Sequence, residues 1–304
     1  MNLRILSLLI PLFLVSCGAP PSARPSSSAA RRFNGEGLRR LERGDLKGAE
    51  EMFHDALREA ELVDDLSGQA EAWNNLGALA AARGAPRDAW AYHATALRFY
   101  QLRSVPDLGQ IRAHANLGSA MLLVGSVDEA EVQFRAASAL AEQLGRPDAG
   151  AMARVGLAAA KLRRGQAEQA ASLANREVQD ARRRGDDGVR AAALSIEGAA
   201  LELLGRLPEA QIRYEEALVL DRRREHPGAV RDDLRALARL SERQGDRVGA
   251  ATYLTRAARV SRRMEDLDSS EEELSRAIRL LGESEEARRL GVELEAIRES
   301  RRRK

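Results

Sequence analysis

The sequence predicts an all-α protein built from stacked helix hairpins, and three observations lead to this fold class. The 304 residues are 44% hydrophobic but only 4% aromatic, with abundant Ala, Leu, Arg and Glu, a composition typical of helices. A glycine followed five residues later by an alanine recurs six times along the chain. A small residue also precedes each of these glycines by seven positions. Such repetition at a fixed spacing indicates an internal structural repeat.

Residues 1–17 have the pattern of a bacterial secretion signal. Arg4 supplies a positive charge, and the largely apolar run over residues 5–15 is too short to span a bilayer as a mature helix. The run ends in Leu14-Val15-Ser16-Cys17-Gly18, which resembles the lipobox of bacterial lipoproteins. The resemblance implies that Cys17, the only cysteine, carries a lipid. The glycine after it resembles the sorting signal for the outer membrane, facing the periplasm.

Residues 18–29 form a Pro/Ser/Ala tract without periodicity, which predicts a flexible tether. This tract argues against a buried structural cysteine at position 17. With a single cysteine, the protein forms no internal disulfide.

Residues 30–270 are interpreted as six helix-turn-helix units, starting near residues 30, 70, 111, 151, 191 and 231. The recurring glycine suits a left-handed cap at the end of the first helix of each unit, and successive glycines lie 40, 41, 40, 40 and 40 residues apart. The glycine–alanine pairs are Gly44/Ala49, Gly84/Ala89, Gly125/Ala130, Gly165/Ala170, Gly205/Ala210 and Gly245/Ala250.

Small and large residues alternate within each unit as two closely crossing antiparallel helices require. The small positions are Gly37, Gly77, Gly118, Ala158, Gly198 and Ala238. A second set of alanines lies at Ala56, Ala96, Ala137, Ala217 and Ala257. Large residues occupy Phe33, Trp73, Leu194 and Leu234 on the first helix, and Phe53, Phe134, Tyr214 and Leu254 on the second.

This combination resembles the tetratricopeptide repeat family, most closely at Asn75-Leu76-Gly77 and Asn116-Leu117-Gly118. The 40-residue period exceeds the common 34 and is similar to that of the kinesin light chain and the spindle-orientation adaptors. The resemblance implies a right-handed superhelical solenoid that binds extended or partly helical peptides in a concave groove. The fourth unit departs most, with Arg154, Ala174 and Glu177 where a large apolar, an aromatic and a small residue are expected.

Residues 271–304 are interpreted as a seventh, degenerate hairpin that caps the solenoid and ends in a basic tail. Ser269 or Ser270, with Glu272 or Glu273, can form a capping box at its start. Leu274, Ile278 and Leu281 share one face, which is expected to pack on the sixth repeat.

The sequence offers no basis for catalysis. The 48 basic and 46 acidic residues nearly cancel, which argues against nucleic acid as a partner. No metal, phosphate-binding or acyl-transfer motif is present, so neither an enzyme, a metal site nor a cofactor is expected. Of the histidines at 54, 93, 114 and 226, His93 and His114 occupy core positions. The acidic pairs at 64–65 and 186–187 are predicted to cap helices.

The resemblance places the groove on the first helix of each repeat. Asparagine amides there can pair with a peptide backbone. The alternative to peptide binding is that each amide only forms a hydrogen bond across the adjacent hairpin. Arginine forks suit carboxylates, unless Asp232 and Glu242 neutralise them in a salt-bridged face. The second and third repeats present Asn74, Asn75, Arg112, Asn116 and Ser119; the fifth presents Ala192, Ser195, Ile196 and Ala199; the sixth presents Arg235, Arg239 and Arg243.

The function expected from these features is a monomeric, lipid-anchored scaffold of the cell envelope that binds a protein or peptide partner. A pilotin-like protein or an outer-membrane assembly factor would share this plan. A structural protein that self-associates through Trp90 and Tyr92 is an alternative, unless both residues only pack internally. A cell-wall enzyme with accessory repeats is disfavoured because the repeats and cap occupy residues 30 to 304.

Overall fold

The computed structural model describes residues 28–103 and 105–302, and all regular structure in these residues is helical. The proposed lipidation site Cys17, most of the predicted tether and the last two residues lie outside the described residues. The chain divides into two compact units after Arg164. The division falls inside the fourth repeat, which is the repeat that departs most from the sequence pattern.

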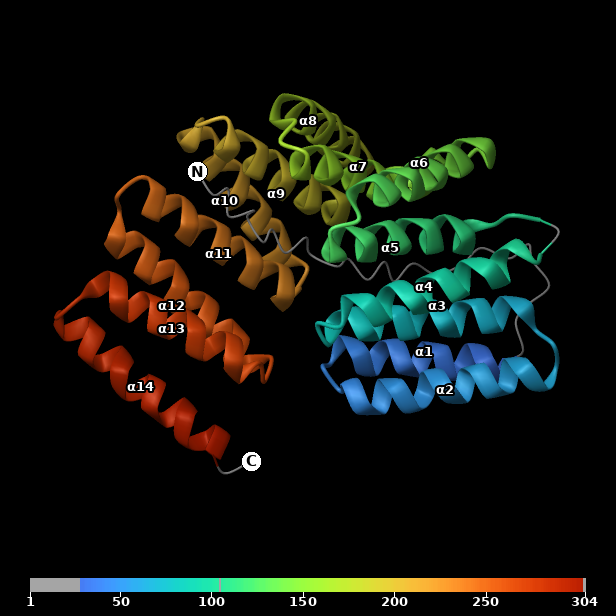
Figure 1. Ribbon diagram of the computed structural model, residues 1–304, viewed down its shortest axis with the longest axis horizontal. Helices are drawn as coiled ribbons and strands as arrows, with labels where there is room; N and C mark the ends of the chain where they lie inside the picture. Colours follow the sequence, from blue (N-terminus) through green and yellow to red (C-terminus); the bar gives the residue numbers. More distant parts are fainter. Residues whose placement is uncertain (1–27, 104, 303–304) are drawn as a thin grey trace. The chain divides into compact units, whose positions relative to one another are not determined.

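Unit 1 consists of antiparallel helices joined by short turns (Figure 1). Its helices are α1 (Ser28–Glu42), α2 (Leu46–Leu62), α3 (Leu66–Ala82), α4 (Pro86–Gln101), α5 (Leu108–Val124), α6 (Val127–Gln143), the 3-10 turn η1 (Pro147–Gly150) and α7 (Ala151–Arg163).

Unit 2 continues the same alternation of helices. Its helices are α8 (Ala167–Arg184), α9 (Asp187–Leu203), α10 (Leu207–Arg223), α11 (Pro227–Arg243), α12 (Arg247–Arg263), α13 (Leu267–Leu281) and α14 (Glu285–Arg302).

The glycine that recurs every 40 residues has the predicted left-handed conformation in each turn, with φ of +82° at Gly44 and +77° at Gly205. Most of the turns that join one repeat to the next, about 20 residues after these glycines, also contain a residue in the left-handed conformation. There it falls on three residues other than glycine, at Asp64, Glu225 and Glu265, with φ between 51° and 60°. An L side chain in this conformation costs free energy, which glycine avoids.

The predicted pairing of a small residue with a ring is confirmed in the first, third and fifth hairpins. A Cβ added to Gly37 would lie 2.4 Å from the Phe53 ring, and one added to Gly198 would lie 2.9 Å from the Tyr214 ring. Phe53 and Tyr214 are themselves almost fully buried. The absent Cβ therefore leaves the space into which the second helix places its ring, and the two helices can pack closely.

Aspartates begin many of the helices, as the sequence predicted for the acidic pairs. The Asp65 carboxylate accepts from the backbone N–H groups of Ser67 and Gly68, and Asp186 accepts from that of Val189. These bonds satisfy amides that the first turn of a helix leaves without partners.

The predicted capping box at Ser269 or Ser270 is wrong. Helix α13 starts at Leu267, and Asp266 caps it by accepting from the Ser269 N–H at 3.1 Å. Ser270 is instead buried, and its hydroxyl donates to the carbonyl of Ala258 at 2.9 Å. Asp266 caps the helix in place of either serine because it lies in the preceding turn, where its carboxylate reaches a free backbone amide of the first helical turn.

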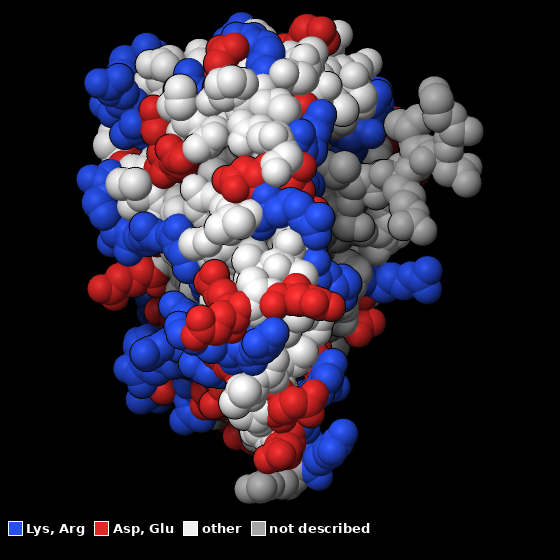
Figure 2. Space-filling model, turned by 90° about the vertical axis from the view of Figure 1, so that its left-hand side faces the viewer, with Lys and Arg blue, Asp and Glu red and all other residues white. Residues whose placement is uncertain are grey.

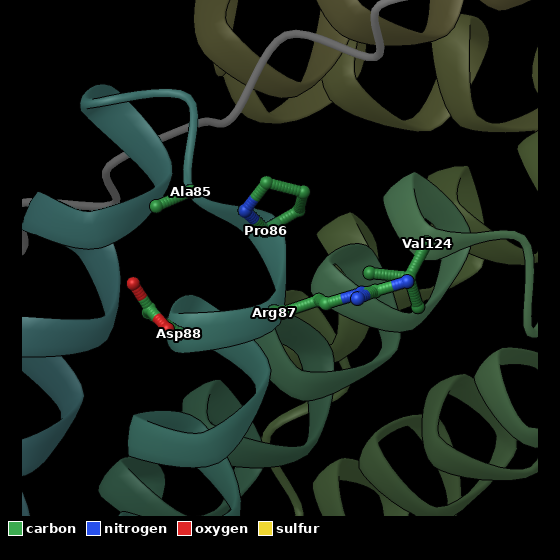
Figure 3. A pocket seen from close by; sticks show the side chains of 5 residues that line it. All are labelled: Ala85, Pro86, Arg87, Asp88 and Val124. Carbon is green, nitrogen blue, oxygen red and sulfur yellow. The ribbon is translucent and has the colours of Figure 1, made fainter.

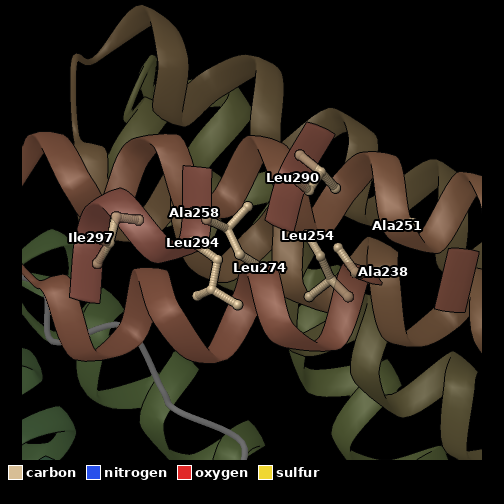
Figure 4. Packing of buried hydrophobic residues seen from close by; sticks show 9 residues of the cluster. Ala238, Ala251, Leu254, Ala258, Leu274, Leu290, Leu294 and Ile297 are labelled. Carbon is tan, nitrogen blue, oxygen red and sulfur yellow. The ribbon is translucent and has the colours of Figure 1, made fainter. Parts of the chain in front are cut away.

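The last hairpin packs on the sixth repeat through an apolar cluster, as expected (Figure 4). Leu274 of α13 is fully buried against Leu254 of α12, and Ile278 and Leu281 lie at the edge of the cluster. Helix α14 completes this core with Leu290, Leu294 and Ile297. The side of α14 away from the cluster carries mostly charged residues, together with the exposed Val292.

The aromatic pair considered for self-association packs internally. Tyr92 stacks on Trp73 with ring centroids 5.7 Å apart, and Trp90 packs at the edge of a cluster formed by Ala80, Ala89 and Ala120. On the charged surface seen in Figure 2, acidic and basic side chains lie next to one another. Among the described helices, none is long and apolar enough to cross a membrane.

Candidate functional site

An asparagine row connects the first helices of the three repeats in unit 1. The Asn75 side-chain amide donates to the Asn34 oxygen at 2.9 Å, and the Asn116 amide donates to the Asn74 oxygen at 3.1 Å. These bonds join α1 to α3 and α3 to α5 in turn. The alternative to peptide binding was that each asparagine bonds across its own hairpin. The observed bonds run instead between successive first helices, and they join residues 41 and 42 positions apart.

His93 supports the row from the second helix of its repeat. Its Nδ1 lies 3.1 Å from the Asn74 oxygen, and because that oxygen can only accept, a hydrogen bond here requires the ring proton on Nδ1. His93 is fully buried beside Gly77, where other repeats place Phe53 or Phe134, and burial lowers its pKa to about 3. The prediction that His93 occupies a core position is confirmed, and its Nε2 has no partner within the described structure.

The row leaves several polar groups available. Among the described residues, the side-chain oxygens of Asn75 and Asn116 and the side-chain NH₂ of Asn74 have no hydrogen-bond partner within the protein. All three asparagines are half-buried, so these groups remain accessible. Two acceptors and one donor along adjacent helices match the groups that a peptide backbone presents.

Arg112 and Ser119 border the row on α5, and both are half-buried. The Ser119 hydroxyl donates to the carbonyl of Ala115 in its own helix at 3.1 Å. Burial raises the pKa of Glu71 on α3, and the positive charge of Arg112 partly opposes that shift. We call the surface formed by residues Asn74, Asn75, Arg112, Asn116 and Ser119, with the buried Asn34 beneath it, the first-helix face of unit 1.

In unit 2, two of the predicted binding arginines hold one buried carboxylate. Glu202 on α9 is 2% exposed, and it accepts from Arg239 at 3.4 Å and from Arg243 at 3.2 Å. Arg243 also donates to the Glu202 backbone carbonyl at 2.8 Å, and the Tyr214 hydroxyl donates to the carboxylate at 3.1 Å. The arginines thus supply the compensation that a buried carboxylate requires.

Arg235 serves a second buried glutamate in the same way. Its guanidinium donates to Glu273 on α13, which also accepts from the Ser261 hydroxyl at 2.8 Å. Asp232 lies 3.6 Å from Arg235, as expected, whereas Glu242 pairs with Arg276 rather than with the three arginines. These contacts favour the salt-bridged alternative over an acidic-ligand site.

A buried pair of acids was missed by sequence reasoning. Asp233 of α11 accepts from the Ser195 hydroxyl of α9 at 2.8 Å and lies beside Asp221 of α10. Burial, and then the nearby charge of Asp221, raises the pKa of Asp233 to about 8. Burial raises the pKa of Asp221 to about 6 against the opposing charge of Arg224. Ser195, predicted to line the groove, is thus engaged between helices.

A shallow depression of about 360 Å³ lies elsewhere, at the turn end of unit 1 (Figure 3). It is lined by Ala85, Pro86, Arg87 and Asp88 at the start of α4 and by Val124 at the end of α5. In Figure 3 the Arg87 side chain extends toward Val124. None of its lining residues belongs to the first-helix face of unit 1.

Two of the other histidines, His114 and His226, have structural contacts. His114 pairs with Gln133 at 2.8 Å, and His226 accepts from the backbone N–H of Ala229 at the start of α11. Burial lowers the pKa of both rings. Within the described residues, no three His, Cys, Asp or Glu side chains are grouped so that they could hold a metal ion.

No family model and no curated protein sequence matches the chain. Solved structures share its fold. NprR in complex with its cognate peptide NprX is 14% identical, with a TM-score of 0.68 over 91% of this chain and 80% of NprR. A kinesin light chain-type protein of Podosopora anserina, with nearly identical TPR-like repeats, is 17% identical, with a TM-score of 0.50 over 67% of this chain and 99% of that protein.

A signal transduction ATPase of Pyrococcus horikoshii with a tetratricopeptide repeat sensor is 15% identical, with a TM-score of 0.62 over 90% of this chain. The chain spans 42% of that protein's length. These likenesses and the 14 α-helices of the described residues show that the chain has the tetratricopeptide-like helical repeat fold.

Proposed function

We propose that this protein is a lipid-anchored scaffold of the bacterial cell envelope, which captures a peptide segment of a partner protein on the first-helix face of unit 1. The observation that carries the proposal is the half-used asparagine row. Asn75 and Asn116 each donate a side-chain N–H to an asparagine of the preceding repeat, and their side-chain oxygens have no partner within the described structure. Because both side chains are held by that bond, binding costs little additional side-chain entropy.

The chemistry of the row favours an extended backbone as the ligand. Oxygen acceptors on α3 and α5 can receive peptide N–H groups, and the free NH₂ of Asn74 between them can donate to a peptide carbonyl. Recognition of this kind depends little on the peptide's side chains. NprR, which has the same fold, was solved with a peptide bound, and this supports the proposal.

The arginines of unit 2 have a different role in this proposal. Arg239 and Arg243 both pair with Glu202, and Arg235 pairs with Glu273, so these arginines mainly hold successive repeats together. Peptide selection is therefore assigned to unit 1. The lipid on Cys17 and the outer-membrane, periplasm-facing location are parts of the proposal that rest on the lipobox pattern alone.

Site-specific photocrosslinking in cells tests the proposal. A photoreactive residue at Ser119 would lie on the first-helix face, and one at Val132 provides a matched control on the second helix of the same repeat, where the side chain is 58% exposed. We expect a discrete adduct with a partner protein from position 119 and none from position 132. The same adduct from both positions, or from neither, would contradict the assignment of the binding face.

A further inference from the structure

Unit 1 exposes large apolar side chains almost entirely at one edge. In the α2–α3 turn Leu62 is 78% and Val63 is 62% exposed, and in the α4–α5 turn Leu102 and Val105 are both 67% exposed. Val132 on α6 is the other exposed large apolar residue among the described residues of this unit. A single exposed leucine needs no explanation, but four large apolar residues exposed in two successive inter-repeat turns form a patch; Leu62 and Leu102 lie one period apart.

The alternation of the helices places this patch at the edge where the folded chain begins. Helix α2 is antiparallel to both α1 and α3, so the α2–α3 turn lies at the same end as Ser28, the first residue of α1. The α4–α5 turn lies at that end too, as the right-hand side of unit 1 in Figure 1 shows. We call residues 28–32, 62–66, 102–103 and 105–108 the inter-repeat edge.

The opposite edge of unit 1, formed by the turns at Gly44, Gly84 and Gly125, has no such patch among the described residues. Its exposed side chains include Arg43, Lys47 and Arg87, and its apolar residues are at least partly covered. The apolar exposure is therefore a property of the α2–α3 and α4–α5 turns and not of turns in general; Leu144, at the α6–α7 turn of the same edge, is half-buried.

The length of the chain before α1 limits how far this edge can be from a lipidated Cys17. Ten residues separate Cys17 from Ser28. Such a segment spans at most about 40 Å, with a root-mean-square reach of about 18 Å if it behaves as a coil. Helix α1 has 15 residues and is about 22 Å long, so the opposite edge lies farther from the anchor by about that distance.

We propose that the inter-repeat edge of unit 1 docks on the lipid bilayer to which the chain is anchored, with Leu62, Val63, Leu102 and Val105 inserted at the interface. This inference rests on the lipid anchor of the proposed function. Docking at this edge directs the helix axes of unit 1 away from the membrane. The first-helix face, with Asn75 and Asn116, then stands along the membrane normal and is open to partners from the side.

The charges of the inter-repeat edge indicate which lipids are sufficient for docking. The edge carries three basic residues and three acidic ones: Arg31, Arg32 and Arg103, and Asp64, Asp65 and Asp107. Because the charges largely cancel, apolar insertion and not attraction to anionic lipid provides the main contact. Docking is therefore expected on vesicles of zwitterionic phosphatidylcholine, with little dependence on salt.

Depth-dependent quenching tests the docking on the lipidated full-length protein. Because Cys17 is blocked by lipid, an environment-sensitive NBD label can be placed on a single new cysteine: Val63→Cys or Leu102→Cys at the edge, and Arg87→Cys at the opposite edge as control. On phosphatidylcholine vesicles we expect blue-shifted emission at 63 and 102, quenched by spin-labelled lipid. The label at 87 should keep its emission in water and escape quenching.

The outcomes separate this inference from the anchor on which it rests. Mass spectrometry first establishes the lipid on Cys17; an unlipidated mature protein would remove the anchor and the docking together. If the lipid is present and positions 63 and 102 remain as water-exposed as position 87, the docking is refuted and the anchor stands. Shielding of 63 and 102 without vesicles would also refute it, because a protein surface would then cover the edge.

Discussion

Replacing the buried histidine of the second repeat should remove a specific pH dependence of stability. In the folded protein the pKa of His93 lies near 3, whereas an unfolded histidine titrates near 6.5. A depressed pKa means that the unfolded state binds the proton more readily, so stability is lost as the pH falls below 6.5 and continues to fall toward 3. At pH 5 this loss amounts to about 2 kcal/mol relative to pH 8.

His93→Phe is the appropriate change, because Phe134 already packs against Gly118 at the equivalent position of the next repeat. Urea unfolding followed by tryptophan fluorescence reports on this region, since both tryptophans, Trp73 and Trp90, lie in unit 1. We expect wild type to lose about 2 kcal/mol more than the variant between pH 8 and pH 5.

The reciprocal change, Phe134→His, should add a similar dependence, because position 134 is equally buried. Histidines 114 and 226, whose pKa values are also lowered, contribute equally to wild type and variants and cancel in the difference. Parallel stability curves for wild type and His93→Phe across this pH range would refute the reasoning.

Three further predictions concern the packing of the repeats. Gly37→Ala should destabilise unit 1 by about 1–2 kcal/mol in urea unfolding, because its Cβ would displace the Phe53 ring; equal stability would mean that the ring moves freely. Glu225→Gly should raise the free energy of unfolding by about 0.5–1 kcal/mol by relieving its positive φ. The raised pKa of Asp233 makes wild type lose stability as the pH rises from 4 to 8. The free energy of unfolding of Asp233→Asn, measured relative to wild type, should therefore increase by more than about 1 kcal/mol over this range. A constant difference between the two proteins would contradict this.

The repeat architecture was predictable from sequence because its requirements are local. Glycines in left-handed turns and small residues opposite rings recur at fixed spacing, and each leaves a direct trace in the residue pattern. His93 could be assigned to the core for the same reason, since it occupies a position that holds an aromatic ring in other repeats. The start of α13 was misplaced because serine and aspartate both favour helix caps, and only geometry decides between them.

The buried charges were not predictable in the same way. Glu202 and Glu273 lie on helices whose composition does not distinguish a solvated glutamate from a buried one, and their burial depends on arginines supplied by another repeat. A signal was nevertheless present. Polar partners on successive first helices lie 38 residues apart for Arg235 and Glu273, and 41 apart for Glu202 and Arg243. A search for complementary side chains close to one period apart would have found them.

The assignment of the binding face is tested most directly by quantitative capture of the partner from envelope extracts. The variant Asn75→Ala/Asn116→Ala removes the free acceptors of the asparagine row, and Glu129→Ala/Val132→Ala is a matched change on exposed positions of α6. Circular dichroism establishes that both variants are folded. We expect the asparagine variant to lose at least about tenfold in partner recovery, equivalent to about 1.4 kcal/mol, while the α6 variant recovers as much as wild type. Equal recovery by all three proteins would contradict the proposed peptide-binding face.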